Sequence, residues 1–179
     1  MTDKPDAIAL LKADHRKVED LFEKFEKAKS DSVKKSLVEQ ICKELSVHTT
    51  IEEEIFYPAC AGQIEDEDLL DESYVEHDGA KVLIAELAAS KPGDEFYDAK
   101  VKVLSEEIKH HVKEEEKRVE GLFAQARDAC LDMDVLADRM SARKEDLLAD
   151  IKANGLPTPK TRSFSGHKLQ QGQPVESRA

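Results

Sequence analysis

The sequence predicts an all-α protein: a four-helix bundle followed by one more helix and a disordered tail. Its 179 residues include seven glycines, six prolines and no tryptophan, and 37% of them are charged. This composition favours helices over strands, which prefer β-branched and aromatic residues. Apolar residues also recur at steps of three and four, which is the period of one helix face. We divide the chain into a bundle domain over residues 1–130, an accessory helix over 131–155 and a tail over 156–179.

The first two predicted helices each carry one apolar stripe. The first begins after Asp3, with Pro5 in its first turn, and the second runs from about Ser32 to Pro58, which ends it. The stripe of the first helix consists of Ile8, Leu11, His15, Val18, Phe22 and Phe25. The stripe of the second consists of Leu37, Ile41, Leu45, His48, Glu52 and Ile55. Both stripes therefore contain a histidine among residues that form a core.

The third and fourth predicted helices repeat this pattern on either side of the turn Lys91-Pro-Gly-Asp. A polar, loop-like segment from Gly62 to Glu67 precedes the third helix. The stripe of the third helix consists of Leu70, Ser73, His77, Ala80, Ile84 and Leu87. The stripe of the fourth consists of Val101, Leu104, Ile108, His111, Glu115, Val119 and Leu122. Four helices thus bring polar groups of the kind that bind metals to one seam.

A fifth helix is predicted over residues 134–154, and Asn154-Gly155 forms its stop signal. Its apolar residues are Leu136, Met140, Leu147 and Ile151. Because it contains no histidine, we interpret it as an accessory helix that caps or lengthens the bundle or binds a protein partner. From Leu156 onward, prolines, glycines, serines and glutamines replace the periodic pattern, which predicts a disordered tail. His167 lies in this tail and is not a site candidate.

Two histidine–carboxylate pairs carry the main functional signal. His48 and Glu52 are four residues apart, as are His111 and Glu115, so each pair lies on one helix face. A further histidine in the apolar phase precedes each pair at a matching distance. The candidate metal ligands are therefore His15, His48, Glu52, His77, His111 and Glu115. One such histidine is usually an ordinary core residue, but four of them in four helices favour a metal site.

His110 competes with His111 for the fourth helix, because each is followed four residues later by a glutamate. Leu104 and Ile108 lie seven and three positions before His111, in the apolar phase of the helix. The residue three positions before His110 is the charged Glu107. We therefore expect His111 to face the seam.

The chemistry of these residues explains why a metal is expected. An ionised carboxylate in an apolar seam costs several kcal/mol unless a cation compensates it, and the pattern places two there, Glu52 and Glu115. Imidazole and carboxylate groups without a thiolate suit iron, manganese or zinc, and they argue against copper(I) and calcium. Helical bundles of this kind hold two metals bridged by carboxylates.

Composition excludes several other classes. A formal net charge of −12 disfavours nucleic acid and anionic lipid as partners. The sequence contains no apolar run of membrane-spanning length. Cys42, Cys60 and Cys130 are odd in number and widely spaced, which favours reduced thiols in a cytoplasmic protein over a disulfide framework. Motifs of hydrolases and nucleotide-binding enzymes are lacking as well.

The order and spacing of several motifs resemble one known family. The motifs are Asp14-His15, His48-x-x-x-Glu52-Glu53 with Tyr57-Pro58 after it, Glu76-His77-Asp78, and His110-His111-Val-Lys-Glu-Glu115 with Leu122-Phe123 after it. Over residues 5 to 126 the chain resembles the hemerythrin-like family, also called HHE cation-binding domains. The resemblance implies an up-and-down four-helix bundle and a non-haem di-iron centre with an oxo or hydroxo bridge. It also implies that Glu52 and Glu115 bridge the two irons and that the four histidines are terminal ligands.

The chain departs from the oxygen-carrying members of that family in its third helix. Those members have a second histidine one turn before the position of His77, where this sequence has Ser73. Either Tyr74 or a carboxylate such as Glu76 could approach the metals instead. A more open centre suits redox reactivity better than protected, reversible oxygen carriage.

Three functions remain as hypotheses. The first is a di-iron protein that binds or responds to dioxygen, peroxide or nitric oxide, as a sensor, scavenger or short-term carrier. The second is an iron-handling or iron-responsive protein whose stability depends on metal occupancy. The third is a helical interaction module without a metal, which leaves the histidines and glutamates in the apolar stripes unexplained.

Overall fold

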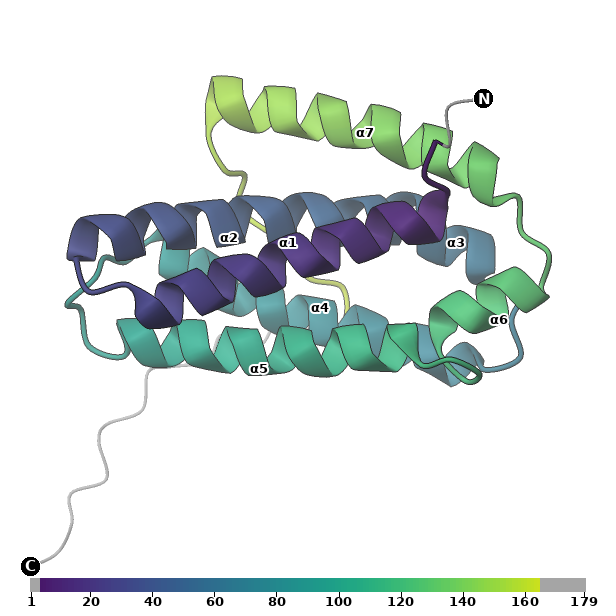
Figure 1. Ribbon diagram of the computed structural model, residues 1–179, viewed down its shortest axis with the longest axis horizontal. Helices are drawn as coiled ribbons and strands as arrows, with labels where there is room; N and C mark the ends of the chain where they lie inside the picture. The colour runs from purple at the N-terminus through teal and green to yellow at the C-terminus, as the bar shows by residue number, and fades with distance from the viewer. Residues whose placement is uncertain (1–3, 165–179) are drawn as a thin grey trace, which may run out of the picture.

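The computed structural model describes residues 4–164, which contain helices and loops and no strand (Figure 1). The helical elements are α1 (Ala7–Lys27), α2 (Asp31–Ile51), η1 (Glu52–Phe56), α3 (Tyr57–Cys60), α4 (Glu67–Ala88), α5 (Tyr97–Glu116), α6 (Leu122–Asp128) and α7 (Met133–Asn154). The predicted all-α fold is confirmed. Within the described residues, no helix combines the length and the apolar character needed to cross a membrane.

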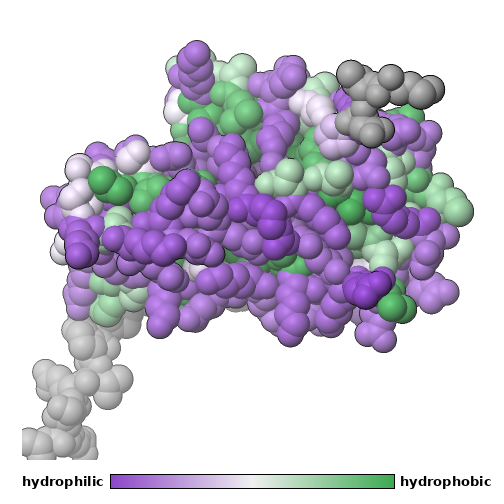
Figure 2. Space-filling model, in the orientation of Figure 1, coloured by the Kyte–Doolittle hydropathy of each residue, from purple (hydrophilic) through white to green (hydrophobic). Residues whose placement is uncertain are grey.

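The four long helices α1, α2, α4 and α5 form an up-and-down bundle (Figure 1). α1 packs on α2 and α5, and α4 packs on α2 and α5. η1 and α3 extend α2 without a break, and α7 lies across α1, α2 and η1. The face formed by α1 and α5 is mostly hydrophilic (Figure 2), as expected for so highly charged a chain.

Side-chain caps set the start of the first two helices. The Asp6 carboxylate accepts a hydrogen bond of 2.8 Å from the Ala9 N–H, so α1 begins at Ala7 rather than directly after Asp3. Ser30 caps α2 in the same way, with its hydroxyl oxygen 3.3 Å from the nitrogen of Val33. Such caps satisfy N–H groups that have no partner in the first turn.

Pro58 does not end the second helix, contrary to the prediction from sequence. The chain turns through the π-helical segment η1, in which the Tyr57 N–H donates to the Glu52 carbonyl, and then continues to Cys60. Pro58 lies in the first turn of α3. Proline is tolerated there because its missing N–H is one that a first turn leaves free.

The fourth helix is shorter than its apolar stripe predicts. α5 ends at Glu116, and Val119, which the pattern places in the core, is 78% exposed. The chain folds back tightly here: a Cβ atom on Gly121 would lie 2.5 Å from the Lys117 carbonyl oxygen, so only glycine fits. Leu122 is buried as predicted, but it begins the separate helix α6.

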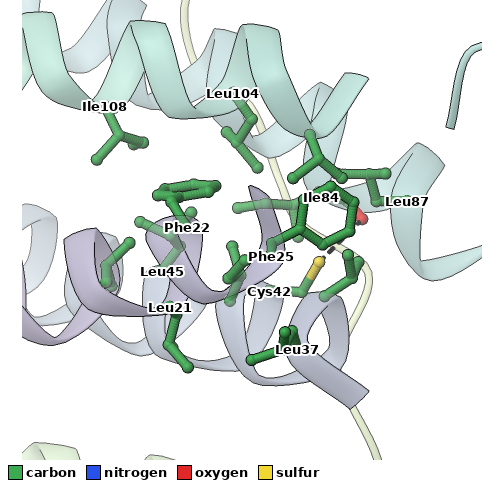
Figure 3. Packing of buried hydrophobic residues seen from close by; sticks show 14 of the residues in the cluster. Leu21, Phe22, Phe25, Leu37, Cys42, Leu45, Ile84, Leu87, Leu104 and Ile108 are labelled. Carbon is green, nitrogen blue, oxygen red and sulfur yellow. Dashed lines mark hydrogen bonds between the residues drawn. The ribbon is translucent and has the colours of Figure 1, made fainter. Parts of the chain in front are cut away.

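The core has two apolar clusters, one toward each end of the bundle. We call the first the apolar end; it lies among α1, α2, α4 and α5 (Figure 3). Its residues include Leu21, Phe22, Phe25, Leu37, Cys42, Leu45, Ile84, Leu87, Leu104 and Ile108. The second cluster joins the start of α1 to η1, α3, α6 and α7, and includes Leu11, Phe56, Leu122 and Met140. The predicted metal ligands lie between the two clusters along each helix.

The residues after α6 cover the bundle on two sides. α7 buries Leu136, Ala137 and Met140, so its apolar face is directed at the bundle. Residues 156–164, which the sequence assigns to a disordered tail, include Arg162 and Ser163, whose backbone N–H groups donate to Asp78 on α4. The rest of the predicted tail, residues 165–179 with His167, lies outside the described residues.

Candidate metal centre

Each of the four long helices contributes one buried histidine to the middle of the bundle. His15 comes from α1, His48 from α2, His77 from α4 and His111 from α5, and none is more than 4% exposed. The structure therefore places His111 in the cluster rather than His110, whose side chain is 64% exposed. The apolar phase of each helix accounts for this arrangement, because the histidines occupy positions that face the seam.

The histidines meet in two pairs through their Nε2 atoms. These atoms are 3.1 Å apart in His15 and His48 and 3.2 Å apart in His77 and His111. Two nitrogen ligands that lie about 2.1 Å from one ion, at a right angle, are about 3 Å apart. Each pair thus has the spacing of two ligands of a single metal ion.

Two glutamates connect the histidine pairs. Oε2 of Glu52 lies 3.1 Å from Nε2 of His48 and 3.4 Å from Nε2 of His77. Oε2 of Glu115 lies 3.4 Å from Nε2 of His15 and 3.5 Å from Nε2 of His111. Each carboxylate therefore faces one histidine of each pair, and we call the closed set of six side chains the six-residue ring. All six predicted site residues come together in it.

The ring fits a bound cation better than it fits a metal-free core. Glu52 and Glu115 are 0% and 1% exposed, yet among the described residues Oε1 of Glu52 and Oε2 of Glu115 have no hydrogen-bond partner. A buried carboxylate oxygen without a partner is costly unless a cation binds it. Cys60 is buried nearby, but it is not among the side chains whose possible ligand atoms come together.

The electrostatics of the two glutamates lead to the same conclusion. Burial, together with the charge of Glu115, raises the pKa of Glu52 well above its ordinary value. Burial also acts to raise the pKa of Glu115, but His111 and His15 outweigh it and lower that pKa to about 2. Without a cation the two neighbouring carboxyls therefore differ in charge, because two anions this close repel each other.

Each imidazole also turns its Nδ1 atom toward a second carboxylate, outside the ring. The Nδ1-to-oxygen distances are 2.8 Å for His15 and Glu116, 2.8 Å for His111 and Glu76, 3.1 Å for His77 and Glu53, and 3.8 Å for His48 and Asp14. We call these four acids the outer carboxylates. Such partners hold metal-binding histidines in one orientation with Nε2 toward the metal.

Comparison with known proteins identifies the family of this chain. The family model of the hemerythrin HHE cation binding domain matches residues 6–123. The chain belongs to this family. A crystal structure of a hemerythrin HHE cation binding domain-containing protein from Mycobacterium kansasii is similar in fold, with a TM-score of 0.67 and 21% sequence identity, and covers 85% of this chain and 95% of that chain. No curated protein matches the chain.

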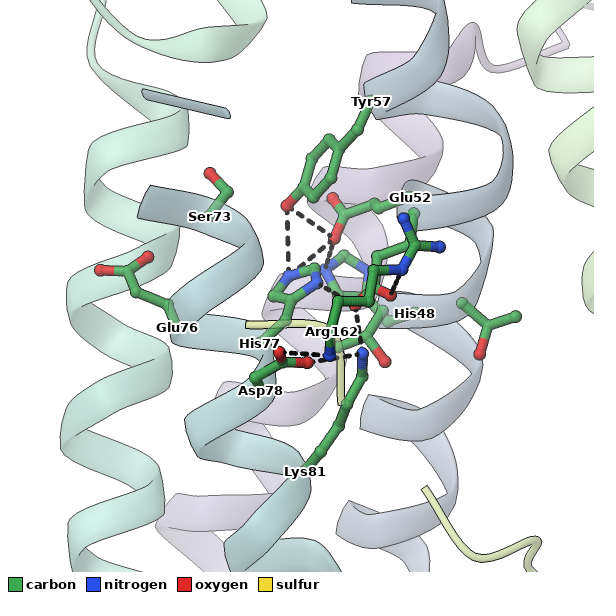
Figure 4. A network of polar contacts seen from close by, with 12 residues as sticks. His48, Glu52, Tyr57, Ser73, Glu76, His77, Asp78, Lys81 and Arg162 are labelled. Carbon is green, nitrogen blue, oxygen red and sulfur yellow. Dashed lines mark hydrogen bonds and ion pairs between the residues drawn. The ribbon is translucent and has the colours of Figure 1, made fainter. Parts of the chain in front are cut away.

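Tyr57 lies at the HHE site, although from the sequence it was named only within the Tyr57-Pro58 motif and not among the ligands. Its hydroxyl lies 3.2 Å from Nε2 of His77 and 3.4 Å from Oε2 of Glu52 (Figure 4). It also donates to Oε1 of Glu115 at 2.9 Å. Residues five apart in an α-helix point about 140° away from each other. The π-helical turn η1 removes this offset and brings Glu52 and Tyr57 to one side.

Tyr57, and not Ser73, supplies the hydroxyl oxygen beside His77. The Ser73 hydroxyl donates to the Leu69 carbonyl of its own helix, at 2.8 Å. Neither residue suggested from sequence takes its place: Tyr74 packs edge-on against the ring of Tyr57, and Glu76 is an outer carboxylate that pairs with His111. The oxygen near His77 comes instead from Tyr57 of α3, which continues the neighbouring helix α2.

A small cavity adjoins the six-residue ring on the side of the apolar end. Its volume is about 10 Å³, which is roughly the space needed for one water-sized molecule. Apolar side chains of three helices, Val18, Leu45, Ile108 and Val112, line it beside the histidines. The ring therefore borders a space for about one water-sized molecule, between the histidines and these apolar side chains.

Proposed function

We propose that the HHE domain holds two iron ions in the six-residue ring and binds or responds to dioxygen, peroxide or nitric oxide. The observation that supports this most strongly is the alternation of pairs and bridges. His15 and His48 would hold one ion, His77 and His111 the other, and Glu52 and Glu115 would bridge them, because each glutamate faces one histidine of each pair.

The donor set supports iron over softer or harder metals. Four imidazoles, two carboxylates and a phenol offer nitrogen and oxygen but no thiolate, which suits iron and also manganese or zinc. Bound iron would supply the electrons and open coordination positions that small oxidants require. The sensor, scavenger and carrier roles share this centre and differ in the fate of the bound molecule.

The chain's own residues would define which molecules reach the centre. The cavity beside the histidines has space for about one water-sized molecule, and apolar side chains form part of its wall. The Tyr57 hydroxyl, which donates to Glu115 at 2.9 Å, supplies an oxygen and a proton at the edge of the ring. The outer carboxylates hold the imidazoles so that Nε2 stays directed inward.

The test is metal analysis and optical spectroscopy of purified protein loaded with iron in air. We expect about two iron ions per chain, an absorption band from charge transfer between ligands and metal, and a spectral change on adding peroxide or nitric oxide. His111→Ala should reduce the iron content, whereas the matched variant His110→Ala should not, because His110 is exposed. One or fewer ions per chain, with no such band, would rule out the proposal.

A second candidate is an iron-responsive protein whose stability reports metal occupancy. The buried, unpartnered oxygens of Glu52 and Glu115 favour it, because they make the metal-free fold costly. Thermal unfolding with and without iron, followed by exposure to oxidants, separates the two candidates. A large iron-dependent shift with no reaction toward peroxide or nitric oxide would favour the second.

A further inference from the structure

The family match ends at residue 123, yet residues beyond it reach the metal centre. α7 and residues 155–164 come after the HHE domain and lie against it on two sides (Figure 1). We call these two segments together the C-terminal clamp. Each segment contacts one of the outer carboxylates, the acids that face the Nδ1 atoms of the histidines.

The first contact runs from α7 to His48. Lys144 forms an ion pair and hydrogen bond with Oδ1 of Asp14, and its side chain is 21% exposed. The other oxygen of Asp14, Oδ2, lies 3.8 Å from Nδ1 of His48. Both of these facing atoms are buried without a hydrogen-bond partner among the described residues. A small movement of Asp14 toward His48 would let these two atoms form a hydrogen bond. Lys144 holds Asp14 close enough for that movement.

The second contact runs from residues 155–164 to His77 (Figure 4). The backbone N–H groups of Arg162 and Ser163 donate to Oδ2 of Asp78 at 2.7 and 2.6 Å. Asp78 in turn accepts from Lys81 at 3.2 Å. These contacts hold Lys81 beside Glu53 of η1, which is the outer carboxylate of His77.

Lys81 and Arg162 then converge on Glu53, the outer carboxylate of His77. Lys81 donates to Oε1 of Glu53 at 2.6 Å, and the same oxygen lies 3.1 Å from Nδ1 of His77. Nε of Arg162 lies 3.5 Å from Oε2 of Glu53. Glu53 is therefore held by one cation of the domain and one of the clamp.

The other two histidines do not depend on the clamp. Glu116, the outer carboxylate of His15, is paired with Arg16 of α1. Glu76, the outer carboxylate of His111, lies 3.5 Å from Nε2 of His110. The clamp thus acts on one histidine of each pair, His48 and His77, which would belong to different metal positions.

We propose that the C-terminal clamp is a positioning part of the metal centre. Through Lys144 and Arg162 it holds Asp14 and Glu53, so that His48 and His77 keep Nε2 directed at the metals. A carboxylate fixed by a cation restricts rotation of the imidazole it faces and favours metal retention. The inference rests on metal binding by the six-residue ring, but it does not depend on which small molecule reacts there.

The first experiment measures how fast a chelator removes iron from the full-length, iron-loaded protein. We expect Lys144→Met to increase the rate of iron loss about tenfold, the lower end of the effect of outer partners. Lys144→Arg, which keeps the charge, should restore most of the retention. Arg143→Met is the matched control, because Arg143 pairs with the exposed Glu54 and not with an outer carboxylate. It should stay within about twofold of the original rate.

The second experiment repeats the measurement at the other contact. Arg162→Gln should increase the rate of iron loss less than Lys144→Met does, because its guanidinium is half exposed and more strongly screened by solvent. Lys160→Gln, a nearby exposed residue, serves as control. Unfolding of each variant without metal separates positioning from general damage to the fold.

Double variants decide whether the clamp acts through the outer carboxylates. If Lys144 works through Asp14, then Lys144→Met should have no further effect on iron loss in the Asp14→Asn background. Arg162→Gln should likewise have none in the Glu53→Gln background. Equal rates for Lys144→Met and Arg143→Met, in protein that still binds iron, would overturn the inference alone. Failure of the original protein to bind iron would overturn the proposed function as well.

Discussion

The apolar end and the metal centre occupy the same four helices and continue the same stripes, but they obey opposite energetics. At the apolar end the stripe positions hold residues such as Phe22 and Leu104, whose burial contributes about 1.5–3 kcal/mol each whether or not a metal is present. A few turns along, the equivalent positions hold histidines and glutamates. Burying the two glutamates together carries a cost that a bound cation would offset. The stability contributed by the apolar end should therefore not depend on metal, whereas that of the metal centre should.

The largest expected effect is the loss of metal-linked stability. Iron at about 1,000 times its dissociation constant should stabilise the protein by about 4 kcal/mol, or roughly 10 °C in the unfolding midpoint. The double variant Glu52→Gln/Glu115→Gln should lose this shift completely, because neutral amides cannot replace bridging carboxylates. Thermal unfolding with and without iron measures it.

Glu54→Gln/Glu114→Gln is the control for that measurement, since neither of these glutamates is in the ring. It should keep the iron-dependent shift. Retention of the full shift by the Glu52→Gln/Glu115→Gln protein would show that the stabilising iron binds elsewhere, and the contrast between the two regions would no longer hold.

The next effect belongs to the apolar end. Leu104 is fully buried, and Leu104→Ala should destabilise the protein by about 2–5 kcal/mol through lost burial and the cavity left behind. The loss should be the same with and without iron. Val103→Ala, at the neighbouring and 43% exposed position, should change stability by no more than about 0.5 kcal/mol. Denaturant unfolding of both forms would check this; a loss confined to the iron-loaded form would contradict it.

Tyr57→Phe should have a smaller effect, located in the metal centre. It removes the donor to Glu115 and leaves a buried carboxylate oxygen without that partner, which costs about 1–3 kcal/mol in the metal-free protein. Iron binding should relieve part of this cost, so the destabilisation should shrink in the iron-loaded form. Tyr74→Phe is the control, because Tyr74 contacts Tyr57 only through its ring. An equal loss in both forms would assign Tyr57 to packing alone.

The regular helical period explains how much of this centre could be predicted from sequence. His15, His48, His77 and His111 continue apolar stripes with steps of three and four, so the phase alone brings them together. The same phase separates His111 from His110, which the structure places at the surface. The four-helix arrangement arises because each stripe needs another to bury it.

The sequence did not predict the features that lie where the regular helical period is interrupted. The π-helical turn η1 shifts the phase after Glu52, so Tyr57 contacts the ring although an α-helical count directs it away. The tight turn at Gly121 ends α5 early and leaves Val119 exposed. Contacts between distant segments, such as Lys144 with Asp14, have no local period at all. The motif Tyr57-Pro58 was visible in the sequence, but Tyr57 was given no role in the site and Pro58 was interpreted as a helix end.

The smallest expected effect, taken per pH unit, is a change of stability with pH in the metal centre alone. Burial by itself lowers the pKa of His15, but Glu115 and Glu116 outweigh it and raise that pKa to about 9 in the metal-free protein. Protonated His15 therefore contributes stability that is fully present below its ordinary pKa of 6.5. That contribution is lost as the pH rises through about 9. The raised pKa of Glu52 acts in the same direction.

Metal binding requires neutral imidazole, so iron affinity should change in the opposite direction. Between pH 7 and 9, the metal-free protein should lose stability by up to about 1.4 kcal/mol per pH unit and proton, while iron affinity rises by up to about tenfold per unit. Unfolding and chelator competition at the two pH values measure both. His15→Asn should lose most of the pH dependence of stability, whereas Leu104→Ala should keep it. Equal stability of the metal-free protein at pH 7 and 9 would mean that His15 is already neutral, and the cost of the centre without metal would then lie in the glutamates alone.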